Sequence, residues 1–414
     1  MKYIIQYMFK PGLVVAMLGL VLVSCNKDLP EPTPKGQGMP AGYTAFELLS
    51  DPAYSTFIAA VNKAGLADLL KNPKSSMTIF APDNAAFTAS GIPAAAIAAL
   101  PAAQLRAILS YHIIGGENYK AAEFSDKFPN NYLQSTLMAL APNAAVPMGY
   151  RVPIFVSRRG TSVWANNIPV TQADIVGSNG VIHKVARVVA PPQQTLWGYL
   201  DTASQFEYLK AAVIRADSGN VTAGTRLQDY LDLGAANFTL FAPNDDVFQA
   251  TLYQLVHPVV YQMIYAQVYQ GQIAGGAPEE MAEAAANAYA TANAPAQTNA
   301  IVGTPDVFKN PALFPVLTKQ LVQAVVSYHL LGFRAFAVNF PAGQSNYPSV
   351  AGNLLPNVQV TIDGSSFQVR GPGNIVVPAP GTVIPYSAVV VTRDQNFVNG
   401  VIHVIDKLLL PIPL

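Results

Sequence analysis

Four of the five histidines in this 414-residue chain stand in repeated phrases, and histidine is the side chain best suited to acid–base catalysis and metal binding near neutral pH. His112 and His329 each end the phrase SYH, and His183 and His403 each end the phrase NGVIH. Two histidines in each half of the chain can form an acid–base pair or part of a metal site. A catalytic zinc site uses three protein ligands, and no carboxylate or further histidine stands at ligand spacing beside these four. We favour the alternative that they are neutral core residues that satisfy buried backbone groups.

No other group of residues in the sequence predicts catalysis. The zinc-protease, nucleophile-elbow and phosphate-loop patterns are missing, and the chain has a single cysteine. Asp245 and Asp246 are neighbouring acids, but their place between an apolar strand and the next helix indicates a helix cap. A net charge of zero with 12% charged residues argues against a nucleic-acid partner. We therefore expect no enzyme activity, no cofactor and no metal.

The first 25 residues have the pattern of an export signal. Lys2 and Lys10 supply positive charge before the apolar run Gly12–Val23, which is shorter than the roughly 20 residues that span a bilayer. The run leads into Leu-Val-Ser-Cys, which resembles the lipobox of bacterial lipoproteins and ends at Cys25. The alternative is an ordinary secretory signal with a chance cysteine. We expect Cys25 to be lipidated and to attach the chain to a membrane.

Residues 26–42 predict a solvated linker, because they contain four prolines and three glycines. Lys27 and Asp28 resemble the charged residues that follow the cysteine in surface-exposed lipoproteins of the Bacteroidetes. The resemblance implies a bacterial outer-membrane location, with a lipid anchor and with the folded part exposed at the cell surface.

Three motifs occur twice in the same order, so the chain after the linker is an internal repeat. TIFAPDNAAF at Thr78–Phe87 returns as TLFAPNDDVF at Thr239–Phe248, and LSYHIIGG at Leu109–Gly116 returns as VSYHLLGF at Val326–Phe333. The third motif is NGVIHKV at Asn179–Val185 and NGVIHVI at Asn399–Ile405. The repeat predicts two copies of one domain.

The motifs also predict the elements that position the histidines. The first motif reads as an apolar strand that ends at a proline and leads into a capped helix. The Tyr-His dipeptides fall where a helix gives way to a strand. Asn179-Gly180 and Asn399-Gly400 are turn signals, because both residue types tolerate positive φ. The strands that follow are apolar on both faces and should be central, which places His183 and His403 in the packing.

The three motifs resemble the fasciclin domain, over residues 43–192 and 194–414. The resemblance implies an α+β fold in which each domain is a wedge of two small β-sheets flanked by helices. It also implies adhesion or matrix interaction without catalysis. In animal members of the family the Tyr-His region is linked to receptor binding. The matching dipeptides make Tyr111, His112, Tyr328 and His329 candidate interaction residues, but the residues around them differ, so no particular receptor is implied.

The second copy contains an insertion at about residues 251–308, because its first two motifs are much further apart than those of the first copy. Inserts on a rigid scaffold are functional loops or flexible decoration. Tyr261, Tyr265 and Tyr269 lie in the insertion at helical spacing, on one face. They form either an exposed aromatic strip for a glycan or protein partner, or a face that packs the insertion onto its own domain.

Together these features predict a non-catalytic, surface-anchored adhesion or interaction lipoprotein. Its expected partners are a membrane, through the lipid on Cys25, and an extracellular protein or polysaccharide from a matrix or cell surface. The alternative is an accessory binding subunit of a glycan-uptake or envelope complex.

Overall fold

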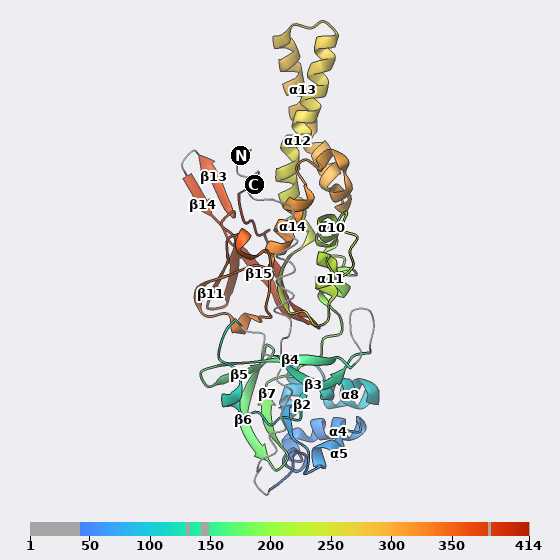
Figure 1. Ribbon diagram of the computed structural model, residues 1–414, viewed down its shortest axis with the longest axis vertical. Coiled ribbons are helices and arrows are strands. Elements are labelled where there is room, and N and C mark those ends of the chain that lie inside the picture. Colours follow the sequence, from blue (N-terminus) through green and yellow to red (C-terminus); the bar gives the residue numbers. More distant parts are fainter. Residues whose placement is uncertain (1–41, 130–132, 142–148, 380–381, 414) are drawn as a thin grey trace.

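The computed structural model describes residues 42–129, 133–141, 149–379 and 382–413. The predicted signal sequence, Cys25 and residues 26–41 of the linker lie outside the described residues. We call residues 43–192 domain 1 and residues 194–414 domain 2. Figure 1 shows an elongated molecule with domain 1 at one end, domain 2 above it and a helical hairpin projecting from domain 2 at the other end.

Domain 1 begins with short helices and ends with a run of strands. Its α-helices are α3 (Ala45–Leu48), α4 (Ser55–Lys63), α5 (Ala67–Lys71), α6 (Asn84–Ala89), α7 (Ala94–Ala99) and α8 (Ala102–Tyr111). Its strands are β1 (Met77–Pro82), β2 (Ile113–Gly115), β3 (Leu133–Ala139), β4 (Arg151–Arg159), β5 (Ser162–Ala165), β6 (Ile168–Gly177) and β7 (Gly180–Val185). A 3₁₀ turn, η3 (Ala121–Glu123), follows β2.

Domain 2 repeats this order with longer helices and an extra hairpin. Its α-helices are α9 (Leu196–Leu200), α10 (Glu207–Ala216), α11 (Leu227–Asp232), α12 (Asp245–Ala274), α13 (Glu279–Val302) and α14 (Lys319–Tyr328). Its strands are β8 (Phe238–Pro243), β9 (Leu330–Leu331), β10 (Gly343–Tyr347), β11 (Val358–Asp363), β12 (Ser366–Arg370), β13 (Ile375–Ala379), β14 (Thr382–Pro385), β15 (Ala388–Phe397) and β16 (Gly400–Ile405). The turn η6 (Ala337–Asn339) corresponds to η3.

The two domains share one strand topology. In domain 1, strands β1 to β7 form a closed barrel in which β1 pairs in parallel with β7 and antiparallel with β2. In domain 2 the order is β10-β11-β12-β15-β16-β8-β9, and a bridge between Leu331 and Ser349 brings its two ends together. Helices flank the strands in both domains (Figure 1). The α+β prediction is confirmed.

The first motif folds as its residue types dictate. Strand β1 is buried along its whole length, and Asp83 caps α6 by accepting a hydrogen bond from the Ala86 amide at 2.7 Å. In domain 2, Asn244 caps α12 in the same way, through the Val247 amide at 3.1 Å. Asp245 accepts from the Tyr208 amide at 2.9 Å and so caps the neighbouring helix α10. Asp245 therefore caps a helix, and Asp246 lies in the first turn of α12, where its charge complements the helix dipole.

The predicted insertion falls on the hairpin of α12 and α13. Each helix is longer than the others of the described chain, with 30 residues in α12 and 24 in α13. The two helices meet along a seam of small residues, Ala282, Ala286, Ala290 and Ala294, each completely buried. A spacing of four places these alanines on one helical face, and alanine lets two helix backbones approach closely. The hairpin is thus an ordered two-helix stalk.

Candidate functional site

His112 and His329 lie at the ends of α8 and α14, and both nitrogens of each ring are hydrogen-bonded to backbone groups. Nδ1 of His112 donates to the Ile108 carbonyl at 2.8 Å, and its Nε2 accepts from the Val189 amide at 2.9 Å. His329 makes the same bonds, to Val325 at 2.7 Å and from Leu409 at 2.9 Å. Burial lowers the pKa of each imidazole to about 4, so both rings are neutral at neutral pH.

His183 and His403 have the opposite proton arrangement. Nε2 of His183 donates to the Tyr119 carbonyl at 3.0 Å, and Nδ1 accepts from the Asp174 amide at 3.3 Å. His403 repeats the pattern with Ala335 at 3.1 Å and Asp394 at 3.2 Å. Burial lowers the pKa of both imidazoles. The described residues contain no group of three or more His, Cys, Asp or Glu side chains placed to hold a metal.

The asparagine of the NGVIH motif is buried and connects two helices of its domain through side-chain hydrogen bonds, so we call it the clamp. Asn399 Oδ1 accepts from the Leu196 amide at the start of α9, and its Nδ2 donates to the carbonyls of Leu231 and Leu233 at the end of α11. Asn179 holds the corresponding groups of domain 1. A side chain on Gly180 or Gly400 would collide with the carbonyl of the preceding parallel strand. The motif repeats because each domain needs this clamp and this close approach.

The side chains of the Tyr-His dipeptides are covered by the protein's own chain, and an interaction role for them stays a prediction. Tyr111, His112, Tyr328 and His329 are all buried at 0–1% exposure. The Tyr111 hydroxyl lies instead at the contact between the domains, where it donates to the Pro153 carbonyl and accepts from the Asn396 amide at 3.4 Å.

The outer face of β4 carries the contact with domain 2. Phe155 is completely buried in a cluster with Phe336 and Val401 of domain 2. The Ser157 hydroxyl accepts from Nδ2 of Asn339 at 2.7 Å. Arg159 donates from Nη2 to three carbonyls of domain 2, those of Val338, Asn339 and Phe340, at 2.9–3.0 Å. Buried apolar and polar contacts of this kind fix the relative orientation of the two domains.

A family model for the fasciclin domain matches residues 52–191 and 298–411, which together make up more than half of the chain. The chain belongs to the fasciclin family. The gap between the two matched segments contains most of the helical hairpin and the helices that precede it.

Several relatives resemble single parts of this fasciclin protein. Transforming growth factor-beta-induced protein ig-h3 from Sus scrofa is 30% identical over 153 residues, which are 37% of this chain and 20% of that protein. Protein sll1483 from Synechocystis sp. is 31% identical over 143 residues, 34% of this chain and 68% of that protein. The chain therefore spans about a fifth of the animal relative.

A solved FAS1 domain pair from the insect cell adhesion molecule Fasciclin I aligns with 87% of this chain and 98% of its own, at 17% identity and a TM-score of 0.33. Fasciclin domains are known from adhesion proteins, and the family match gives no positive indication of catalysis.

Arg334 is a feature of the fasciclin pair that sequence reasoning missed. Its guanidinium is completely buried in domain 2 and donates to Oδ1 of Asn237 and Asn396 and to the Val398 carbonyl at 2.8–3.0 Å. Asn396 also donates to Tyr111 of domain 1, so this network reaches the domain contact. Burial lowers the pKa of the guanidinium. In the sequence, the position is a single arginine after a glycine and a phenylalanine, with no pattern that predicts burial.

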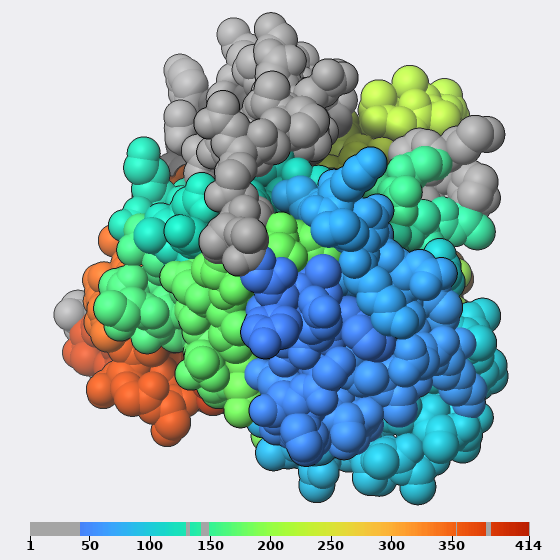
Figure 2. All heavy atoms as spheres, turned by 90° about the horizontal axis from the view of Figure 1, so that it is seen from below, coloured from blue at the N-terminus to red at the C-terminus, as the bar shows by residue number. Residues whose placement is uncertain are grey.

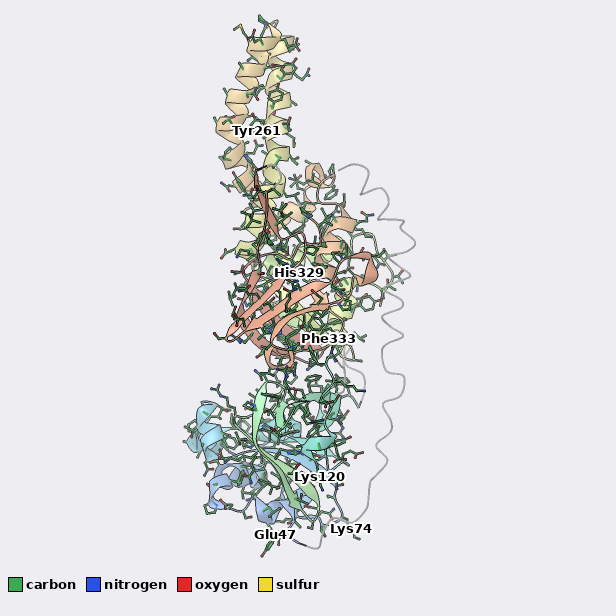
Figure 3. The ribbon with its side chains drawn as sticks, turned by 90° about the vertical axis from the view of Figure 1, so that its left-hand side faces the viewer. Glu47, Lys74, Lys120, Tyr261, His329 and Phe333 are labelled. Atoms are coloured by element: carbon green, nitrogen blue, oxygen red, sulfur yellow. The ribbon has the colours of Figure 1, made fainter. Side chains whose placement is uncertain are left out.

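The free end of domain 1 corresponds to the docking end of domain 2. Thr78 Oγ1 donates to the Glu117 carbonyl as Thr239 Oγ1 donates to the Phe333 carbonyl, which makes Glu117 and Phe333 equivalent. By the same alignment Lys120, before η3, is equivalent to Phe336. Figure 2 views this end of the molecule, and Figure 3 shows Phe333 on the side of domain 2 that faces domain 1. Domain 1 therefore has the charged residues Glu117 and Lys120 at the positions where domain 2 has Phe333 and Phe336, which face domain 1.

The opposite end of domain 2 is closed by its own chain. Gly371, just after β12, lies so close to the Tyr328 ring and the Leu410 carbonyl that a Cβ there would collide with both. Asn374 ties the segment down, since its Oδ1 accepts from the Gly371 and Leu410 amides and its Nδ2 donates to the Leu408 carbonyl at 2.7 Å. We call Gly371–Asn374 the cover segment. It lies over Tyr328, whereas the equivalent Tyr111 of domain 1 meets domain 2.

The predicted tyrosine strip lies along the hairpin, where Figure 3 labels Tyr261. The Tyr261 hydroxyl donates to Oδ1 of Asn287 on α13 at 3.0 Å, and the rings of Tyr265 and Tyr269 stack at 5.9 Å. All three side chains are half-buried against the hairpin. The geometry favours the packing interpretation, and a role of these tyrosines in binding stays a prediction.

Proposed function

We propose that this protein is a non-catalytic adhesion or interaction lipoprotein. The main support is its pair of fasciclin domains, fixed to each other through the outer face of β4, in which every repeated histidine is used by backbone groups. Such a pair is a rigid scaffold that presents surfaces to a partner. The ligand class we propose is a matrix protein, a cell-surface protein or a polysaccharide.

Capture assays test this function. A chain beginning at Asn26, whose two domain cores consist of residues from Ala45 onward, would be applied to an array of matrix proteins and polysaccharides. We expect saturable capture of at least one ligand by the native chain and none by the heat-unfolded chain. Absence of specific capture over the whole array would reject the proposal.

Anchoring through Cys25 is a separate part of the proposal. Within the described residues no helix is long and apolar enough to cross a bilayer, and the lipobox-like sequence ends at Cys25. An attached lipid of more than one acyl chain would give stable membrane attachment.

Replacing Cys25 with serine removes the thiol that would carry the lipid. We expect the C25S protein to remain unprocessed and to lose incorporation of radiolabelled palmitate, while Ser24→Ala retains both processing and label. Membrane fractionation and cell-surface protease accessibility then report the location. A C25S protein that is processed and fractionates like the parent would show that the lipoprotein assignment is wrong.

A further inference from the structure

The outer face of the domain 2 sheet carries a regular array of polar side chains. Strand pairing places Gln344, Thr361 and Gln368 side by side across β10, β11 and β12. A second row, two residues along each strand, consists of Asn346, Gln359 and Arg370. Neighbouring strands are about 4.8 Å apart, and alternate residues of one strand are roughly 6.7 Å apart on the same face. The six positions therefore form a flat grid, which we call the amide face.

The amide face is accessible and mostly unused. Gln344 and Asn346 are exposed, and Gln359, Thr361 and Gln368 are partly exposed. The only hydrogen bond from these five side chains to another described residue is from Nε2 of Gln368 to the Ser366 hydroxyl at 3.2 Å. Residues between them point inward, where Val360 and Val369 belong to the core. The fold thus requires the inward residues of these strands and leaves the outward ones free to vary.

The same face of domain 1 is an established contact surface. Tyr111 donates to the Pro153 carbonyl as Tyr328 donates to the Asn357 carbonyl, and the registers of β4 with β5 and of β11 with β12 agree. Phe155 is then equivalent to Gln359, and Ser157 to Thr361. Domain 1 uses these positions to bind domain 2, through a buried aromatic ring. Domain 2 has polar side chains there, which suit a hydrated partner.

The chemistry of the amide face indicates the partner. An amide side chain offers both donors and an acceptor, and adjacent amides can bond neighbouring hydroxyls in pairs. Arg370 is the only charged member of the grid, so the face has little to offer a polyanion. Val389 and Val391 of β15 are exposed beside the grid, with Val389 directly opposite Gln368. Such branched apolar groups can pack against the C–H surfaces of sugar rings.

We propose that the amide face of domain 2 binds a neutral polysaccharide chain laid across strands β10, β11 and β12. This inference rests on the proposed adhesion function and names its ligand class and site. Figure 3 views the molecule from the side on which these strands lie. Binding through several solvated hydrogen bonds predicts a weak single site, strengthened when many copies meet one polymer.

The test compares two triple variants of the chain from Asn26. The first is Gln344→Ala, Gln359→Ala and Gln368→Ala on the amide face. The control is Gln262→Ala, Gln267→Ala and Gln270→Ala, which removes three exposed glutamines from α12. The probes are the neutral polysaccharides dextran, laminarin and galactomannan, with alginate and heparin as acidic comparators, measured by affinity electrophoresis and calorimetry. Melting temperatures show that both variants are folded.

We expect at least one neutral polysaccharide to be retained by the parent and the control, with roughly tenfold or greater weakening in the amide-face variant. A second variant, Thr361→Arg, should block the face sterically and give the same loss. Equal binding by all variants would overturn the inference, and so would preference for the acidic polymers. If matrix proteins are captured but no neutral polysaccharide is, the site assignment fails while the proposed function stands. If nothing is captured, both fail.

Discussion

Replacing Asn399 with alanine should lower the free energy of unfolding of domain 2 by about 3–5 kcal/mol. The side chain makes three hydrogen bonds, to the Leu196 amide and to the carbonyls of Leu231 and Leu233. Alanine removes all three, and within the described residues only the Leu233 carbonyl keeps another partner, the Ala236 amide. These bonds connect the start of α9 with the end of α11, so we expect domain 2 to lose stability as a whole and to unfold in one cooperative transition. Urea unfolding followed by circular dichroism measures it.

The matched control is Asn299→Ala, an exposed position near the end of α13, which should change stability by less than about 0.5 kcal/mol. Asn179→Ala should act on domain 1 as Asn399→Ala acts on domain 2, because Asn179 bonds the Ala45 amide and the carbonyls of Leu70 and Asn72. A loss below about 1 kcal/mol at either clamp position would show that the clamp contributes little.

Acid should destabilise the protein strongly between pH 6.5 and pH 4. Burial lowers the pKa of His112 and of His329 from 6.5 to about 4 in the folded chain. Below pH 6.5 the unfolded chain binds protons at these positions and the folded chain does not, so stability falls as the pH falls towards the folded pKa. The expected loss is about 3 kcal/mol for each histidine. Above pH 6.5 neither state is protonated, and this dependence disappears.

The molecular reason is the direction of two hydrogen bonds. Nε2 of each ring accepts from a backbone amide, of Val189 in domain 1 and of Leu409 in domain 2, so a proton on Nε2 would face another N–H group. The double variant His112→Gln, His329→Gln is the control, because its amides do not titrate. Unfolding free energies at pH 7 and pH 4 should differ by about 6 kcal/mol less in the double variant than in the parent. An unchanged difference would mean that carboxylates cause the acid sensitivity.

The sequence predicted the fold class because the repeated motifs encode local rules. A proline at the end of a strand, a helix-capping residue and an Asn-Gly turn each determine the conformation of adjacent residues. Their effect can therefore be predicted without knowing the rest of the chain. The role of His183 and His403 in packing followed from alternation with apolar residues, and the structure places both rings in buried hydrogen bonds.

The domain contact could not be predicted in this way. Arg159 meets Val338, Asn339 and Phe340, and Phe155 meets Phe336, across separations along the chain that no local pattern spans. The hairpin β13–β14 was not predicted either. It stands where domain 1 has the tight turn at Asn166, and it lies after the first two motifs, whose spacing revealed the other insertion. The burial of Tyr111 could not be predicted from the resemblance, because a shared dipeptide carries no information on which other parts of the chain cover it.

The cover segment prevents domain 2 from repeating the contact that domain 1 makes around Tyr111. Domain 2 docks on domain 1 through the surface around Tyr111, and a third unit, or the first domain of another molecule, would need the equivalent surface around Tyr328. Gly371–Asn374 and Leu410 already occupy the part next to Tyr328, while the amide face stays exposed. Head-to-tail docking of this kind generates open filaments when it continues from molecule to molecule. Here the chain itself covers Tyr328, so the contact that Tyr111 makes with domain 2 cannot be repeated at the same place on domain 2. With the lipid anchor that we propose, avidity would come from the density of molecules on the membrane.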